Sequence, residues 1–235
     1  MTKGIIYYTH NILEESMFSI VQKQILKAGL PIVSVSLKPI NFGQNIVLDL
    51  KPGVITMFRQ ILTALEASTS DVIFFCEHDV LYHPSHFDFE PSRNDVFYYN
   101  VNVWRWLFPE NLAVAYGGSK SVSGMCGYRQ LLLDHYRLRM KIIEENGFEN
   151  GRNPRWARMM GYEPGKPKRK GGISDIPYET WRSPYPNIDI RHKGAITQTK
   201  RSLKDFRNPP DPETWKETTI DQIEGWNLKE LFNLQ

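Results

Sequence analysis

The sequence predicts an α/β sandwich built on a mainly parallel sheet, and three observations support this. Short apolar runs rich in β-branched residues alternate with stretches of helical periodicity over residues 1–80. Such alternation is typical of sheets covered by helices on both faces. The Val72–Cys76 run is unbroken apolar sequence, as expected for a central buried strand. Apolar and charged contents of 41% and 23% are ordinary globular values and exclude general disorder.

The first half of the chain supplies the elements of this sandwich in order. The strands and helices are expected at Gly4–Tyr8 (strand), Glu14–Ala28 (helix), Pro31–Leu37 (strand), Ile46–Leu50 (short strand or extended loop), Val54–Ala67 (helix) and Val72–Cys76 (strand). In parallel sheets of this kind ligands bind at the carboxyl ends of the strands. The segments Thr9–Asn11 and Glu77–Asp79 therefore mark the expected site.

The second half is less regular. Its expected elements are a strand or paired strands over Asp95–Trp106, a short strand at Ala113–Tyr116, a long amphipathic helix over Tyr128–Asn146, a strand at Asn187–Arg191 and a short helix near Ile220–Phe232. A loop rich in Gly, Pro and basic residues over 149–172 is expected to be mobile. The glycines and serines between Gly117 and Gly127 are interpreted as turn formers or as backbone that lies close to a bound ligand.

Length and cysteine content bound the organisation. The 235 residues are interpreted as a single domain, with halves at 1–110 and 111–208 and a C-terminal tail at 209–235. Two cysteines, Cys76 and Cys126, exclude a disulfide framework and favour a reducing, cytoplasmic location. No apolar run reaches the roughly 20 residues of a membrane helix, and the first ten residues are interpreted as a strand rather than as a secretory signal.

The net charge of +3 is unevenly placed. Two basic clusters occur in the second half: Lys166, Lys168, Arg169 and Lys170, then Arg191, Lys193, Lys200, Arg201 and Lys204. Clusters of this kind bind phosphates of nucleotides or nucleic acids. The alternative, a solvated basic surface, is equally compatible with charge alone.

The strongest chemical signal is Glu77-His78-Asp79 at the end of the Val72–Cys76 strand. Buried strands do not end in two acids unless the charges find partners. Residues at i and i+2 of an extended segment face the same way, so both acids can face one point. Mg²⁺ or Mn²⁺ held by carboxylates and substrate phosphates is one such partner. An acidic turn paired with Lys or Arg, or a helix N-cap at Asp79, is the other interpretation.

The stretch from Pro52 through Gln60 to Asp79 resembles the family 2 glycosyltransferases. In that family a helix with an Arg-Asn pair precedes a strand that ends in an Asp-x-Asp metal motif. Here the helix carries Arg59-Gln60 and the motif is Glu77-x-Asp79. The resemblance spans residues 4–82 and is looser beyond them. It implies a Rossmann-like three-layer α/β/α sandwich (the A-type glycosyltransferase fold), a nucleotide-sugar donor and a bound divalent metal.

The resemblance also implies roles for particular residues. Asp79, Glu77 and a late-strand histidine, His192, would hold the metal, because neutral imidazole is a competent Mn²⁺ ligand. Donor contacts would come from Thr9, His10, Asn11, Arg59, Glu77, His78 and Lys193. Without the motif, His192 would be interpreted as an ordinary surface or core histidine.

Transfer to a hydroxyl also needs a general base if it inverts. Related enzymes take this base from an acid upstream of the late histidine, and Asp175 and Glu179 both match by order. Either could instead cap a turn or pair with Arg182.

The sequence therefore predicts a glycosyltransferase of the hexosyl- or pentosyltransferase class that uses Mn²⁺ or Mg²⁺ and a nucleotide-diphosphate sugar. The acceptor hydroxyl stays open among modified DNA, a glycan and a lipid head group, and the basic second half would tolerate an anionic one. Two alternatives are kept: a nucleotide- or nucleic-acid-binding protein, for which acids at the strand edge bring no gain, and a nucleotidyltransferase.

Overall fold

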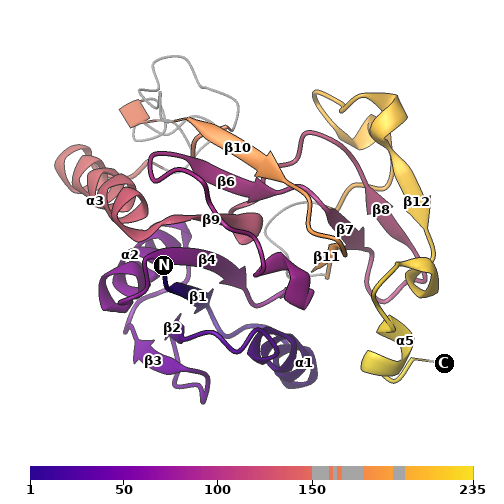
Figure 1. Cartoon of the computed structure of the whole chain (residues 1–235), viewed down its shortest axis with the longest axis horizontal. Helices are drawn as coiled ribbons and strands as arrows, with labels where there is room; N and C mark the ends of the chain where they lie inside the picture. Colours follow the sequence, from indigo (N-terminus) through magenta and orange to yellow (C-terminus); the bar gives the residue numbers. More distant parts are fainter. Residues whose placement is uncertain (150–158, 161–162, 166–176, 193–198, 235) are drawn as a thin grey trace.

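The computed structural model describes residues 1–149, 159–160, 163–165, 177–192 and 199–234. Two sheets make up the framework of this part of the chain (Figure 1). The helices are α1 (Glu15–Leu26), α2 (Val54–Ala67), α3 (Arg129–Asn146) and α5 (Leu228–Leu231). Short 3₁₀ turns lie at η1 (Pro84–His86), η2 (Val122–Gly124), η3 (Leu203–Asp205), η4 (Pro212–Thr214) and η5 (Ile220–Gln222).

The first sheet has seven strands in the order β10-β6-β9-β4-β1-β2-β3. Their bounds are β1 (Lys3–Thr9), β2 (Ile32–Ser36), β3 (Gln44–Val47), β4 (Val72–Glu77), β6 (Phe97–Asn100), β9 (Met125–Tyr128) and β10 (Tyr178–Trp181). Neighbouring strands pair in parallel except where β9 lies antiparallel between β4 and β6. The predicted mainly parallel sheet is therefore confirmed.

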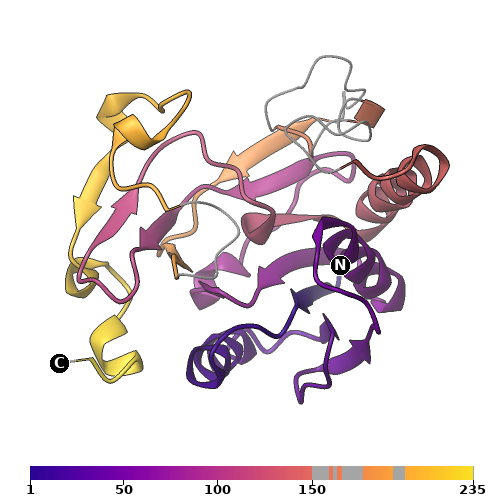
Figure 2. The ribbon, with the colours of Figure 1, turned by 180° about the vertical axis from the view of Figure 1, so that it is seen from behind.

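Alternation of side chains along β1 and β4 builds a three-layer sandwich. Ile5 and Phe74 point into one apolar cluster, which they share with α1 and the second sheet. Ile6 and Phe75 point into the other, which they share with α2 and α3. Figures 1 and 2 show α2 and α3 together at one side of the molecule and the second sheet at the other. The three-layer α/β/α fold class is thus confirmed, with a sheet added to the layer that holds α1.

This second sheet was not predicted. Its five strands run in the order β12-β8-β7-β11-β5, with bounds β5 (Val80–Leu81), β7 (Val103–Trp106), β8 (Ala113–Ala115), β11 (Asn187–Ile190) and β12 (Lys216–Thr218). The Asp95–Trp106 stretch, expected as one strand or a pair, is divided between the sheets, with β6 in the first and β7 in the second. The two short strands are separated by Val101 and Asn102 alone.

The C-terminal segment packs into the body of the protein. β12 pairs antiparallel with β8, and Ile220, Ile223 and Leu228 are buried in the cluster that also holds Trp106. Residues 209–234 therefore complete the second sheet and its core. No helix in the described part of the chain has the length and apolar character needed to span a bilayer.

Candidate functional site

A cavity of about 630 Å³ opens where β1 and β4 end. Five chain segments line it, contributing Tyr8, Thr9 and His10; Pro52, Gly53, Val54, Thr56, Met57 and Gln60; Glu77, His78 and Asp79; Tyr116, Ser119, Lys120, Ser121, Val122 and Ser123; and Asp189 and Arg191. Its volume is within the usual range of ligand pockets, about 300–1,000 Å³. The sequence-predicted segments at the ends of β1 and β4 thus meet at one cavity, and a loop after β8 and the end of β11 form its remaining wall.

The end of β1 combines one cavity residue with one clamp. His10 lines the cavity, whereas Asn11 adopts a left-handed backbone conformation with φ of 59°. The Asn11 Oδ1 atom accepts hydrogen bonds from the backbone of Leu37 and Lys38 at 2.9 and 3.0 Å. Asn11, predicted as a donor contact, therefore ties the loop after β1 to the loop after β2.

The predicted Arg59 and its neighbour Gln60 point in different directions. Arg59 is half-exposed, lies outside the cavity lining and is 3.8 Å from Glu144 of α3. Gln60 is 3% exposed and lines the cavity. Its Nε2 donates to the carbonyls of Thr9 at 2.7 Å and Val35 at 3.1 Å. The structure thus brings Gln60 to the cavity instead of Arg59, with its amide nitrogen fastening the ends of β1 and β2.

Glu77 is oriented by two tyrosines. The Tyr8 hydroxyl donates to the Glu77 carboxylate at 2.6 Å, and the Tyr82 hydroxyl accepts from the Glu77 backbone nitrogen at 2.9 Å. Burial, together with the charge of Glu77, raises the pKa of Tyr8, so this hydroxyl keeps its proton and stays a donor. One oxygen of the first acid of the motif is therefore engaged within the protein.

Asp79 and His192 meet across the two sheets. The Asp79 Oδ2 and His192 Nε2 atoms are 3.6 Å apart, and the two side chains are 18% and 17% exposed. The backbone carbonyl of Asp79 accepts from Ile190 of β11 at 2.8 Å, which holds the two chain segments together. Burial by itself raises the pKa of Asp79, but the contact with His192 and the charge of Arg191 are among the interactions that outweigh it and lower the pKa. Asp79 is a carboxylate.

Two further imidazoles lie beside this pair. The rings of His10 and His78 are 4.8 Å apart in an edge-to-face arrangement. Burial lowers the pKa of both histidines, against the opposing charge of Asp79. Both rings are therefore neutral at neutral pH and can offer a nitrogen lone pair to a metal or accept a hydrogen bond.

The residues present fit a loosely held divalent cation. In the described part of the chain no three His, Cys, Asp or Glu side chains are grouped as a ready-made metal site. A carboxylate and an imidazole do converge at Asp79 and His192. Mg²⁺ and Mn²⁺ sites that depend on substrate phosphates need only one or two protein ligands of this kind.

In the wall at the end of β11, Arg191 was predicted only as part of a basic cluster, and Asp189 was missed by sequence reasoning. Asp189 and Arg191 alternate with the buried Ile188 and Ile190, so both face the cavity. An Arg191 Nη2 atom donates to the Asp189 carboxylate. Burial and the nearby Asp79 charge raise the pKa of Asp189, whereas Arg191 and Arg105 oppose the shift. The alternation of Asp189 with two isoleucines was the sequence signal for a strand with one polar face.

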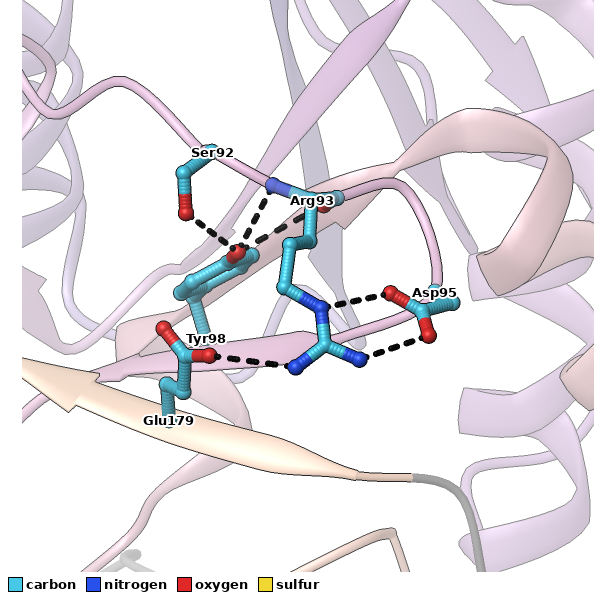
Figure 3. Close-up of polar contacts among 5 residues, drawn as sticks. All are labelled: Ser92, Arg93, Asp95, Tyr98 and Glu179. Atoms are coloured by element: carbon cyan, nitrogen blue, oxygen red, sulfur yellow. Dashed lines mark hydrogen bonds and ion pairs between the residues drawn. The ribbon is translucent and has the colours of Figure 1, made fainter.

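Glu179 lies elsewhere. It sits on β10, the edge strand of the first sheet, is 45% exposed, and is 3.7 Å from Arg93, which also binds Asp95 through two hydrogen bonds (Figure 3). Glu179 is not among the residues that line the cavity, so the structure does not bring this predicted base to the site. Asp175, Lys193 and most of the 149–172 loop lie outside the described residues.

The cavity lies at the carboxyl ends of a mainly parallel sheet, which is where α/β proteins of this class bind their ligands. Among solved structures, the chain is similar to a glycosyltransferase involved in the glycosylation of the major capsid of PBCV-1, with a TM-score of 0.45 and 11% identity over 77% of this chain and 82% of that one. It is also similar to the apo-form glycosyltransferase GlyE of Streptococcus pneumoniae TIGR4, with a TM-score of 0.37 and 11% identity. That match covers 64% of this chain and 41% of GlyE. No family model and no curated protein matches the sequence.

Proposed function

We propose that this protein is a metal-dependent glycosyltransferase that moves a sugar from a nucleoside-diphosphate sugar to a hydroxyl acceptor. The observation that carries the proposal is the Asp79–His192 pair. A carboxylate at the end of β4 and an imidazole just beyond β11 lie 3.6 Å apart beside the cavity. The resemblance of Glu77-x-Asp79 to an Asp-x-Asp motif supports the same chemistry.

In this proposal Asp79 and His192 hold Mn²⁺ or Mg²⁺ together with the donor diphosphate. When bound, the metal would offset the negative charge that develops on the departing nucleoside diphosphate. Arg191, next to His192 and lining the cavity, adds a guanidinium that can bind phosphate oxygens through two hydrogen bonds.

The chain's own residues prepare the donor side of the cavity. Tyr8 fixes Glu77, so that carboxylate faces the donor as an oriented hydrogen-bond acceptor, the role that ribose hydroxyls require. Gln60 holds the carboxyl ends of β1 and β2 together by donating to the carbonyls of Thr9 and Val35. This preorganisation reduces the ordering cost of binding a flexible nucleotide. The proton acceptor for the acceptor hydroxyl stays a prediction at Asp175.

The test is a donor screen. Release of nucleoside diphosphate from UDP-glucose, UDP-N-acetylglucosamine and GDP-mannose is measured with and without Mn²⁺, alongside release of pyrophosphate. We expect Mn²⁺-stimulated release of a nucleoside diphosphate from at least one donor. Pyrophosphate release would instead identify a nucleotidyltransferase and contradict the proposal.

Asp79→Asn is the decisive variant, because it removes the carboxylate charge with little change of shape. We expect it to lower Mn²⁺-dependent turnover more than about 100-fold, since even residues outside the first coordination shell contribute about 10- to 100-fold. Asp134→Asn, at an exposed position on α3, is the matched control and should leave turnover unchanged. A folded Asp79→Asn protein with full Mn²⁺ stimulation would refute the proposed metal role.

A further inference from the structure

Lys120 presents a positive charge at the cavity from the loop between β8 and η2. Its side chain is among those that line the cavity. In the described part of the chain, the structure gives its ammonium an aromatic ring as neighbour and no carboxylate partner. An ammonium group has three N–H donors and no acceptor. Lys120 can therefore donate to an anionic ligand that enters the cavity.

The loop that carries Lys120 is fixed at both of its ends. At its start, the Gly117 backbone nitrogen donates to the Thr214 hydroxyl at 3.0 Å. Just beyond its end, Val122 packs against the apolar cluster that holds Phe75, and the next residue, a serine, is buried. Lys120 thus lies on a short segment whose backbone is held from two sides.

The side chain of Lys120 is confined as well. Its Nζ atom lies 5.0 Å from the ring centroid of Tyr178 on β10. Gly165 has a φ of 82°, and a Cβ there would lie 2.6 Å from the Tyr178 ring and 3.0 Å from Cδ of Lys120. Glycine at this position lets main chain approach both side chains closely. A cation–π contact with an exposed ring is weak, so it orients the ammonium and leaves it able to bind a stronger partner.

The charges that line the cavity leave an anionic ligand with few cationic partners. Among the described lining residues, Glu77, Asp79 and Asp189 contribute three carboxyl groups. The cations are Arg191 and Lys120, because burial lowers the pKa of both lining histidines and keeps them neutral. Arg191 donates to Asp189 and has further interactions. Lys120 is the lining cation that no carboxyl group of the described chain engages.

The proposed reaction brings a strongly anionic group into this cavity. The donor diphosphate gains negative charge as the bond to the sugar breaks, because the bridging oxygen leaves with the phosphate. A metal held by Asp79 and His192, together with Arg191, would offset part of this charge. Donors that are already fixed in place are effective at such a site, since they need no reorganisation during the reaction. Lys120 is a donor of this kind on a separate wall.

We propose that Lys120 binds a phosphate of the departing nucleoside diphosphate and that Tyr178 is the positioning residue for its ammonium. The inference rests on the proposed function, because it takes the ligand of the cavity to be a nucleoside diphosphate. It adds a contact from the wall that follows β8 to the metal and to Arg191.

The test measures binding rather than turnover. UDP, GDP and ADP are titrated by ligand-observed NMR in the presence of Mn²⁺, and the nucleoside of the tightest diphosphate is the uncharged reference. Lys120→Met keeps a long side chain and removes the charge. It should weaken that diphosphate about tenfold or more, since charge-assisted hydrogen bonds are roughly twice as strong as neutral ones. Binding of the nucleoside should not change. Wild-type diphosphate affinity in this variant would overturn the proposal.

The same titrations separate this inference from the function on which it rests. A wild-type protein that binds none of the three diphosphates would contradict the proposed glycosyl transfer, and the role of Lys120 with it. A protein that binds one of them equally well with and without Lys120 would contradict the role of Lys120 alone.

Two further variants show whether the charge of Lys120 is responsible. Arginine keeps the charge and the donors, so Lys120→Arg should retain the diphosphate affinity to within about threefold. A loss as large as that in Lys120→Met would assign the effect to packing of the side chain and overturn the proposal. Lys141→Met, at a position on α3 whose side chain is 70% exposed, is the matched control and should bind as the wild type does.

The positioning role of Tyr178 has its own comparison. Tyr178→Leu removes the ring and should weaken the diphosphate about threefold, because the weak cation–π contact is lost. Tyr178→Phe keeps the ring and should bind with wild-type affinity. Unchanged binding in the leucine variant, or equal weakening in both variants, would contradict the positioning role.

Discussion

At the scale of single residues, the most informative pair is Arg59 and Gln60. They are neighbours on α2, yet one is half-exposed beside α3 and the other is buried at the cavity. In a helix, consecutive residues point about 100° apart, so a two-residue motif can bring only one of its members to a given site. The resemblance on which Arg59 was predicted matched the motif, and the helix orientation decided which residue reached the cavity.

We predict that Gln60→Met destabilises the protein by about 2–3 kcal/mol, because two buried carbonyls lose their donor. Arg59→Met should cost less than about 0.5 kcal/mol, since its exposed ion pair contributes little. Urea unfolding of both variants measures the difference. If the two variants have equal free energies of unfolding, the hydrogen bonds of Gln60 to the ends of β1 and β2 do not stabilise the protein.

At the scale of elements, two glycines in left-handed conformations lie in the turns on either side of β2. Gly29 follows α1 with φ of 63° and has open space around it. Gly43 precedes β3 with φ of 60°, and a Cβ there would lie 2.4 Å from the Ile32 carbonyl oxygen. Only the second position combines backbone strain with a steric clash against backbone.

Gly29→Ala should therefore cost about 1–2 kcal/mol, the usual penalty of the left-handed region. Gly43→Ala should cost clearly more, because β2 or the β2–β3 turn must also shift. Chemical denaturation of the two variants provides the comparison. Equal losses in the free energy of unfolding would mean that the turn before β3 accommodates the added methyl group without further cost.

Much of the framework could be predicted because local pattern determined it. The Val54–Ala67 helix was placed at its observed ends, and the strands at Gly4–Tyr8 and Val72–Cys76 were placed within a residue or two. The second sheet could not be predicted, because strands of two to four residues carry little periodicity and their partners lie far away in the chain. Pairing of β7 with β11 joins residues more than 80 positions apart.

The residues of the candidate site likewise fall into those that could be predicted from the sequence and those that could not. Thr9, His10 and Glu77–Asp79 were predictable because they follow buried strands, and their meeting follows from parallel topology. Asp189 was not, since its place in the site depends on the pairing of β11 with the distant strand β7. Glu179 was predicted from chain order alone, and chain order does not say that β10 lies at the far edge of the sheet.

At the scale of the whole molecule, two buried histidines make stability depend on pH. His86 and His135 are enclosed on opposite sides of the first sheet, and burial lowers the pKa of each to about 3. For His135 the positive charge of Arg139 adds to the effect of burial. The unfolded chain binds a proton at each histidine below about pH 6.5, whereas the folded protein does not.

Stability should therefore be complete above about pH 6.5 and decline as the pH falls from there toward 3. At pH 5 each histidine should cost about 2 kcal/mol relative to pH 8, from the linkage between proton binding and folding. His86→Gln should flatten the decline by about half of this combined amount, whatever it does to stability at pH 8. Urea unfolding of both proteins at pH 8 and pH 5 measures this loss of stability. If His86→Gln loses as much free energy of unfolding between the two pH values as the wild type, His86 is not one of the histidines responsible.

Because the walls of the cavity come from two different sheets, residues on one wall can be changed separately from those on the other. Tyr8–His10 and Glu77–Asp79 follow or end strands of the first sheet, whereas Tyr116 and the loop of Ser119–Ser123 follow β8 in the second. Ser119, Lys120 and Ser121 lie outside the buried core, whereas Val122 packs against the apolar cluster that holds Ile6 and Phe75, and Ser123 is buried. Libraries that vary Ser119, Lys120 and Ser121 could therefore change what this wall of the cavity binds while leaving the ends of β1 and β4 as they are.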